Sequence, residues 1–177
     1  RDIKSPFFFP IEKTVSITGR GQVLVGTVTR GILKKNDPIE IIGYGQTIKT
    51  VAVDIQVFKN SVNECSAGQH VGILGRGLKG ESVRRGMVGV APNSIKQSNF
   101  YEVQIYMLKK EEGGRNKPIL NGYAQPLLTN TASVDCSFVM PKEKEMLLGG
   151  DNITLNILLK FPMPFQVGDK FTSKFNY

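Results

Sequence analysis

The stretch Val15-Ser-Ile-Thr-Gly-Arg-Gly-Gln-Val-Leu-Val-Gly-Thr-Val-Thr-Arg-Gly-Ile-Leu-Lys-Lys-Asn-Asp37 decides the fold class of this chain. It holds two β-type runs, and the turn Gly19-Arg20-Gly21 separates them. Glycines on both sides of one arginine allow a sharp reversal that leaves Arg20 pointing outward. Valine and threonine alternate from Val23 to Thr29, as is typical of a half-buried strand. The stretch therefore predicts a strand, a tight turn and a second strand.

Further runs of the same kind follow in the first half of the chain. Strands are expected over Pro38–Ile42, Thr50–Val57, His70–Leu74 and Met87–Ala91, and the polar connector Lys59–Glu64 is expected to hold at most a helical turn. On the strand expected over Thr50–Val57, one face is expected to carry Val51, Val53, Ile55 and Val57, and the other face Thr50, Ala52, Asp54 and Gln56. About six strands in about 90 residues, with Gly-rich turns, predict a small closed barrel.

The pattern restarts after Pro92-Asn-Ser94. Alternation over 103–107 begins a second set of strands. Inward faces are expected at Val134, Cys136, Phe138 and Met140, and at Ile153, Leu155, Ile157, Leu159 and Phe161. The sequence therefore predicts an all-β protein with two tandem antiparallel β-barrels, one over 1–93 and one over 94–177.

Charge and composition narrow the class of partner. The 177 residues carry a net charge of +8, and no apolar run approaches the length that spans a bilayer, so no membrane partner is expected. A balance this basic favours nucleic acid or an acidic protein as partner, and a merely soluble basic surface is the alternative.

The first residue is Arg1 and not Met, so a fragment or a processed chain is expected. Cys65 and Cys136 are expected to be free thiols in a reducing compartment, with a disulfide as the alternative.

The residues needed for catalysis or metal binding are scarce. His70 is the one histidine of the sequence, and a packed or surface role suits it better than a catalytic role. No Cys-x-x-Cys, His-Glu-x-x-His or phosphate-loop spacing occurs. The sequence therefore indicates a binding module and not an enzyme.

Basic residues gather in two glycine-containing loops. The first group is Arg76, Lys79, Arg84 and Arg85, and the second is Lys109, Lys110, Arg115 and Lys117. Lysine and arginine in such loops reach phosphates without reading a base sequence, which suits a structured RNA. Solvated loop charges are the alternative interpretation of each group.

Several segments carry a family likeness. They include Ser16-Ile-Thr-Gly-Arg-Gly21, Arg30-Gly-Ile-Leu-Lys34, Arg76-Gly-Leu-Lys79 and Glu111-Glu-Gly-Gly-Arg115. With them, in order along nearly the whole chain, the sequence resembles the second and third domains of elongation factor Tu. The Glu-Glu-Gly-Gly-Arg segment beside a second barrel favours this family over initiation factor 2 or elongation factor G.

The resemblance implies a translation elongation factor that carries aminoacyl-tRNA to the ribosome in a GTP-dependent manner, with this chain as its tRNA-binding half. It implies that a GTPase domain with GTP and Mg²⁺ precedes Arg1, so no cofactor is expected in this chain. The implied partners are aminoacyl-tRNA, the ribosome, that GTPase domain and elongation factor Ts. In the family, the first barrel holds the aminoacyl end and the second touches the T stem and elongation factor Ts.

Carried over residue by residue, the resemblance implies tRNA contacts at Glu12, Lys13, Val15, Arg20, Val25, Phe58, Lys59, His70, Arg84, Arg85, Arg115 and Asn116. Several of these depart from the family pattern. Lys13 replaces an aspartate, Val15 replaces the aromatic beneath the terminal adenine, and Val25 replaces a threonine. Gln56 replaces a glutamate beside the adenine, and His70 replaces an asparagine. These changes favour recognition of an altered or restricted set of aminoacyl-tRNAs, with phosphate contacts carrying more of the affinity.

The divergence favours a location in the mitochondrial matrix, with the bacterial cytoplasm as the alternative. Ile32–Lys35 and Pro141–Glu145 also resemble mitochondrial members.

The family's chain continues past Tyr177 through a segment that closes the second barrel, and without that segment an unpaired strand edge is expected. The alternative function is a paralogue that keeps the barrels and acts mainly as a protein-interaction module.

Overall fold

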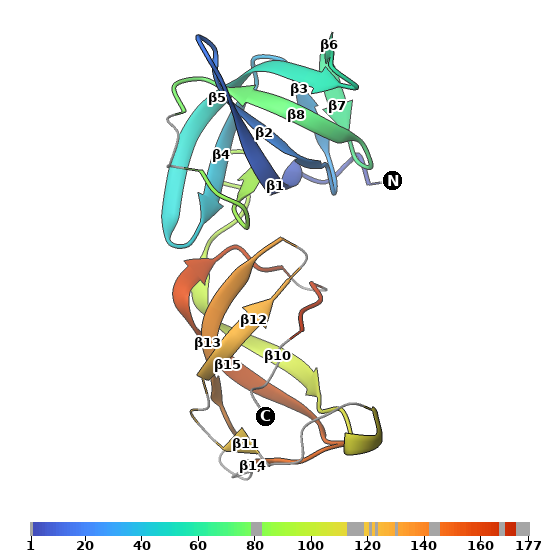
Figure 1. Ribbon diagram of the computed structural model, residues 1–177, viewed down its shortest axis with the longest axis vertical. Helices are drawn as coiled ribbons and strands as arrows, with labels where there is room; N and C mark the ends of the chain where they lie inside the picture. Colours follow the sequence, from blue (N-terminus) through green and yellow to red (C-terminus); the bar gives the residue numbers. More distant parts are fainter. Residues whose placement is uncertain are drawn as a thin grey trace. The chain divides into compact units, whose positions relative to one another are not determined.

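The computed structural model describes residues 2–78, 83–112, 119–120, 122, 124–129, 131–141, 146–166 and 169–172 (Figure 1). Within these ranges the chain forms β-strands and one short 3-10 helix, η1 (Lys110–Glu112), and no α-helix. None of the described residues belongs to a helix with the length and apolar character that crossing a membrane would take. The predicted all-β class is confirmed.

The chain divides into two compact units, Arg1–Gln97 and Ser98–Tyr177. The sequence places the division after residue 93, and in the structure the next four residues lie with the first unit. Ile95 packs against the apolar cluster of Phe8, Ile42, Val88 and Val90. The side chain of Gln97 accepts a hydrogen bond from the backbone N–H of Gly45.

The first unit is a closed antiparallel barrel. Its strands are β1 (Phe8–Ile17), β2 (Gly21–Thr27), β3 (Ile32–Lys34), β4 (Pro38–Gly43), β5 (Gln46–Val57), β6 (Asn60–Val62), β7 (Glu64–Ser66), β8 (His70–Gly75) and β9 (Val88–Val90). Six of them pair in the order β4-β9-β1-β2-β8-β5, and β5 pairs again with β4, which closes the ring. β6 pairs antiparallel with the last residues of β5, and β3 pairs with β7 (Figure 1). The closed barrel predicted from the sequence is thus present.

The Gly-Arg-Gly turn joins β1 to β2 as predicted. Ile17 pairs with Gly21, and the backbone N–H of Arg20 donates to the carbonyl of Ile17 at 3.0 Å. Gly19 has a φ of +81°, a conformation that glycine adopts without steric cost. The turn leaves Arg20 exposed at the tip of the hairpin.

The prediction for Lys59–Glu64 is wrong, because this connector forms β6 and β7 and no helical turn. Phe58 and Lys59 have φ values of +52° and +66°, and Val57 pairs with Asn60 across them. Two consecutive positive φ values make the two-residue hairpin turn that usually carries Asn-Gly. Phe-Lys does not give that signal.

The predicted faces of the long run are wrong in part. The pairing of β5 with β8 shifts between Ala52 and Asp54, so one extra residue enters β5 there. Ala52 and Ile55 are consequently both buried in the core, whereas Val51 and Val53 are only half-buried. A bulge of one residue exchanges the two faces of a strand, which simple alternation does not anticipate.

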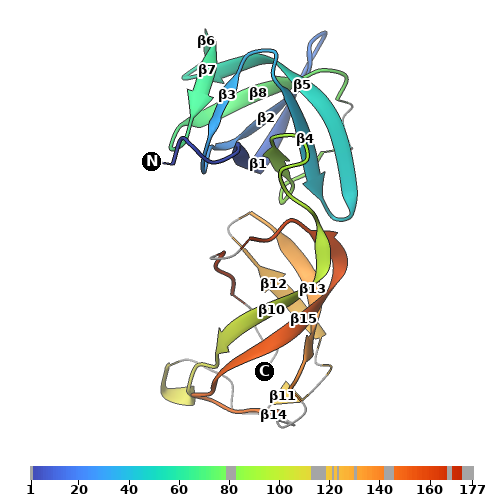
Figure 2. The ribbon, with the colours of Figure 1, turned by 180° about the vertical axis from the view of Figure 1, so that it is seen from behind.

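The second unit is also antiparallel. It contains β10 (Ser98–Tyr106), β11 (Ile119–Leu120), β12 (Ala124–Leu128), β13 (Ser133–Val139), β14 (Met146–Leu147) and β15 (Asn152–Met163). The sheet order is β10-β15-β13-β12, and β11 pairs with β14 (Figure 2). Leu128 and Thr172 exchange backbone hydrogen bonds of 2.7 and 2.8 Å, so a later segment pairs with the edge strand β12 at this point.

The inward face predicted on β13 is confirmed, since Val134, Cys136, Phe138 and Met140 are all buried. On β15, Leu155, Ile157 and Leu159 are buried, but Phe161 is 40% exposed. The pairing with β10 shifts near this end, where Phe100 faces Leu158 and Ser98 faces Met163. Met163 fills the interior position in place of Phe161, because the extra residues of β15 bulge outward.

Candidate nucleic-acid interface

One row of residues crosses five strands on the outer face of the first barrel. The ladder partners along this row are Lys13 (β1), Val25 (β2), Gly72 (β8), Gln56 (β5) and Ser61 (β6). Leu24, Ile55 and Ile73, which neighbour these residues in sequence, are buried in the core. Because successive side chains alternate across a strand, the row faces outward. The fold therefore brings together Lys13, Val25 and Gln56.

Two adjacent rows add further predicted residues to this outer face. Val15 lies opposite Val23, which in turn lies opposite Leu74 on β8. Thr27 lies opposite His70, and Thr27 Oγ1 is 3.1 Å from His70 Nδ1. Val15 is 43% exposed and His70 is exposed. The exposed members of these rows, Lys13, Val15, Thr27 and His70, thus share one accessible surface, called the outer face.

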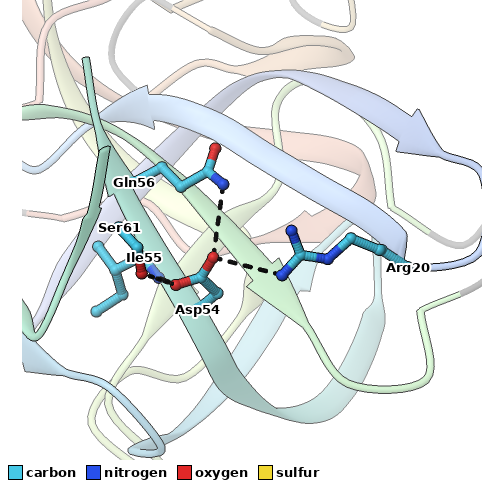
Figure 3. A network of polar contacts seen from close by, with 5 residues as sticks. All are labelled: Arg20, Asp54, Ile55, Gln56 and Ser61. Atoms are coloured by element: carbon cyan, nitrogen blue, oxygen red, sulfur yellow. Dashed lines mark hydrogen bonds and ion pairs between the residues drawn. The ribbon is translucent and has the colours of Figure 1, made fainter. Parts of the chain in front are cut away.

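Asp54 anchors a polar network beside this surface (Figure 3). Its carboxylate accepts hydrogen bonds from Ser61 Oγ at 2.5 Å and from the backbone N–H of Ile55 at 3.0 Å. Gln56 Nε2 lies 3.5 Å from Asp54 Oδ2, and Arg20 Nη2 lies 3.7 Å from the same oxygen. The hydrogen bond from Ser61, more than any other contact, holds the pKa of Asp54 below its ordinary value.

The network fixes the orientation of Gln56. An ionised carboxylate only accepts hydrogen bonds, so the amide nitrogen of Gln56 must face Asp54. Figure 3 shows the amide oxygen pointing away from the carboxylate. Gln56 therefore presents an acceptor oxygen. The sequence predicts a strand at Asp54 and no role for its side chain, although an acidic residue within an apolar run is a signal that its charge has partners.

Contacts on the side of β1 away from β2 hold Arg84 and Arg85. The guanidinium carbon of Arg84 lies 3.6 Å from the ring centre of Tyr44, and Arg85 Nη1 donates to the backbone carbonyl of Glu12 at 3.1 Å. The pairing of β1 with β2 shifts between Ile11 and Lys13, so Glu12 has no partner on β2. Arg85 therefore contacts β1 at Glu12, the residue that precedes Lys13.

The remaining predicted residues lie elsewhere. Phe58 and Lys59 form the tip of the β5–β6 hairpin, where Phe58 is 93% exposed.

Of the first basic loop, Arg76 is exposed after β8. Arg115 and Asn116 lie outside the described residues, as do Lys79 and Lys117. Of the second basic loop, the structure describes η1, where Glu112 Oε1 accepts hydrogen bonds from the Tyr106 hydroxyl at 2.7 Å and the Lys109 N–H at 3.1 Å.

The described part of the chain holds no group of three or more His, Cys, Asp or Glu side chains that could bind a metal ion. The outer face presents the Lys13 ammonium, the Gln56 amide, the His70 imidazole and the exposed Val15 side chain, and Arg85 contacts β1 at its border. Such a surface is suited to binding a polyanion that also carries flat, hydrogen-bonding groups.

Comparison with known proteins identifies both units. The family model described as Elongation factor Tu domain 2 matches residues 21–90, which contain β2 to β9. The family model described as Elongation factor Tu C-terminal domain matches residues 94–174, which contain β10 to β15. The two matches follow each other in the order of the two units.

Proposed function

The chain belongs to the elongation factor Tu family of translation factors, whose domain 2 and C-terminal domain it carries in order, and we propose that it binds aminoacyl-tRNA for delivery to the ribosome. The first barrel receives the aminoacyl end of the tRNA on its outer face. GTP and Mg²⁺ belong to a GTPase domain outside these residues, and delivery depends on that domain.

One observation carries this proposal: Lys13, Val15, Val25, Gln56 and His70 lie on one exposed face although they come from four different strands. Arg85 is bound to the carbonyl of Glu12, next to Lys13. Bases and the aminoacyl group contact the strand face, and phosphates contact the arginines at its border. This division of contacts is common in RNA recognition.

The composition of the outer face supports a restricted choice of aminoacyl-tRNA. Lys13 and Val15 are both exposed, so the positive charge and the small aliphatic side chain are presented directly to the ligand. A lysine near the α-amino group repels it, and a valine stacks poorly on a base. Phosphate contacts then supply a larger share of the affinity.

A salt titration of tRNA binding tests the proposal, with the wild-type protein compared with Arg85→Gln. Removing one phosphate contact is expected to lower the slope of log K against log salt by about 1. Lys160→Gln is the matched control, because it removes one exposed positive charge from β15 and is expected to leave the slope unchanged. Wild-type binding that does not weaken with rising salt would contradict the proposal.

Phe58 favours a second candidate function, a module for protein interaction. Phe58 is 93% exposed at a turn with positive φ, so its ring is available for contact with a partner protein. Binding of a protein partner that survives high salt, together with no measurable tRNA binding, would support this candidate over the first.

The proposed further partners are the ribosome, the GTPase domain of the same protein and elongation factor Ts. The proposed location is the mitochondrial matrix. The support for elongation factor Ts and for this location is the resemblance of sequence.

A further inference from the structure

Tyr44 occupies a backbone conformation that few side chains adopt. It forms the tip of the β4–β5 hairpin between Gly43 and Gly45, and its φ is +52°. Left-handed backbone is sterically unfavourable for a bulky residue, and it persists where the surrounding contacts fix it. The contacts of Tyr44 therefore indicate what this turn does.

Tyr44 contacts both arginines of the pair. The ring centre lies 3.6 Å from the guanidinium carbon of Arg84, and the hydroxyl donates to the backbone carbonyl of Arg85 at 3.3 Å. A separation this short is typical of stacked planar groups. A guanidinium stacked on a ring is held through its face, which leaves the N–H groups at its edge free to bind phosphate oxygens.

The two segments that meet at this contact are themselves fixed to the barrel. On the hairpin side, Gln97 accepts from the Gly45 N–H at 3.2 Å and donates to the carbonyl of Gln46 at 2.9 Å. On the arginine side, the N–H of Ile11 donates to the carbonyl of Met87 at 2.9 Å. Neither arginine is therefore a freely solvated loop charge.

We propose that Tyr44 is a positioning residue, which holds Arg84 and Arg85 in the arrangement that binds RNA phosphates. The proposal rests on the function proposed above, in which this pair contacts the tRNA backbone. An arginine side chain has several rotatable bonds, and binding a phosphate normally immobilises them. Stacking on Tyr44 immobilises Arg84 before the RNA arrives, and the bond from Arg85 to Glu12 does the same for its neighbour.

The test compares tRNA binding by Tyr44→Leu and Tyr44→Phe. Leucine removes the ring and is expected to weaken binding about 2- to 5-fold, the size of an exposed cation–π contact. Phenylalanine keeps the ring under Arg84 and is expected to bind within about 2-fold of wild type. Neither change alters the charge of the protein, so the salt slope is expected to stay at the wild-type value. If the Tyr44→Leu variant fails to fold, Tyr44→Asn also removes the ring, and asparagine adopts left-handed backbone more readily.

A double-mutant cycle separates positioning from a general effect on the barrel. In an Arg84→Gln background, Tyr44→Leu is expected to cause a smaller loss of affinity than in wild type, because the stacked side chain is absent and only the contact with the Arg85 carbonyl remains. An equal loss in both backgrounds, or wild-type affinity in both Tyr44→Leu and Tyr44→Asn, would overturn the proposal while leaving the proposed function standing. Wild-type affinity and salt slope in Arg84→Gln and Arg85→Gln would instead overturn the proposed function, and the role of Tyr44 with it.

Discussion

Arg20 and Asp54 join the β1–β2 turn to strand β5, with 3.7 Å between Arg20 Nη2 and Asp54 Oδ2. Arg20 is 55% exposed at this contact, whereas the Asp54 side chain is 10% exposed. Ion pairs with one exposed partner contribute little by themselves. The importance of this pair lies in Asp54, whose carboxylate also binds Ser61 and the backbone of Ile55.

The first prediction concerns the pH dependence of stability. The pKa of Asp54 is lowered on folding from its ordinary value of 3.8, so the ionised form stabilises the folded chain. This contribution is fully present above pH 3.8 and is lost as the pH falls through the lower pKa of the folded state. Asp54→Asn is expected to be less stable than wild type by about 1–3 kcal/mol at pH 7, and the difference is expected to shrink below pH 3.8. Urea denaturation followed by circular dichroism measures both.

Ser61→Ala is the companion variant, because it removes the largest cause of the lowered pKa and keeps the carboxylate. It is expected to cost about 1 kcal/mol at pH 7 and to move the acid transition upward. A difference between wild type and Asp54→Asn that is as large at pH 3 as at pH 7 would contradict this account.

The second prediction concerns the two cysteines. Cys65 and Cys136 are free and buried, and burial raises the pKa of each thiol to about 11. At pH 8, about one thiol in a thousand is then ionised, and the thiolate is the reactive form. The folded protein is expected to react with Ellman's reagent only as fast as it opens. Two thiols are expected to react at once in concentrated urea, and equally rapid reaction of the folded protein would refute the prediction.

The third prediction compares two glycines with nearly equal backbone conformation. Gly19 and Gly31 have φ values of +81° and +82°. A Cβ atom at Gly19 would meet no atom within 4 Å, whereas at Gly31 it would lie 2.6 Å from backbone atoms of Phe7. Gly19→Ala is expected to cost about 1–2 kcal/mol through backbone strain alone. Gly31→Ala is expected to cost at least about 4 kcal/mol or to prevent folding. Thermal and urea denaturation of the two variants isolate the steric part, and equal losses would show that the close approach is absent.

The fourth prediction tests the altered surface at Val15. Val15→Phe places an aromatic ring at an exposed position of the outer face and is expected to strengthen aminoacyl-tRNA binding by about 1–3 kcal/mol. Val15→Leu adds apolar size without a ring and serves as the control. The gain is expected to disappear with a tRNA that lacks its 3′ adenosine. The same gain with the shortened tRNA would exclude stacking on that base.

The sequence was sufficient to predict the strand, turn and strand around Gly19 to Gly21, because the signals for them are local. It was insufficient for the hairpin at Phe58 and Lys59, where the pairing of Val57 with Asn60 closes a turn that these residues do not favour. It was also insufficient for β5, where one inserted residue buries Asp54 among polar partners. Such insertions depend on pairing with strands distant in sequence, and that pairing is absent from local periodicity.

The same limit applies to the candidate site. Family likeness identified Lys13, Val25 and Gln56 one by one, and the strand register aligned them. Tyr44 and Asp54, which orient the arginine pair and Gln56, were missed because their roles depend on side-chain contacts between hairpins. A tyrosine between two glycines predicts only a turn, and its contact with Arg84 is visible only in the structure.

Strand β9 has a consequence for how this protein is made. Val90 pairs with Phe8 on one side and with Glu40 on the other, so a strand of three residues joins the two ends of the ring. A nascent chain that ends before Met87 has β1, β2, β8 and β5 available to align, but β1 and β4 each keep an open edge. Until β9 emerges, these two strand edges are available to pair with another chain. Only the emergence of Val88–Val90 ends that exposure.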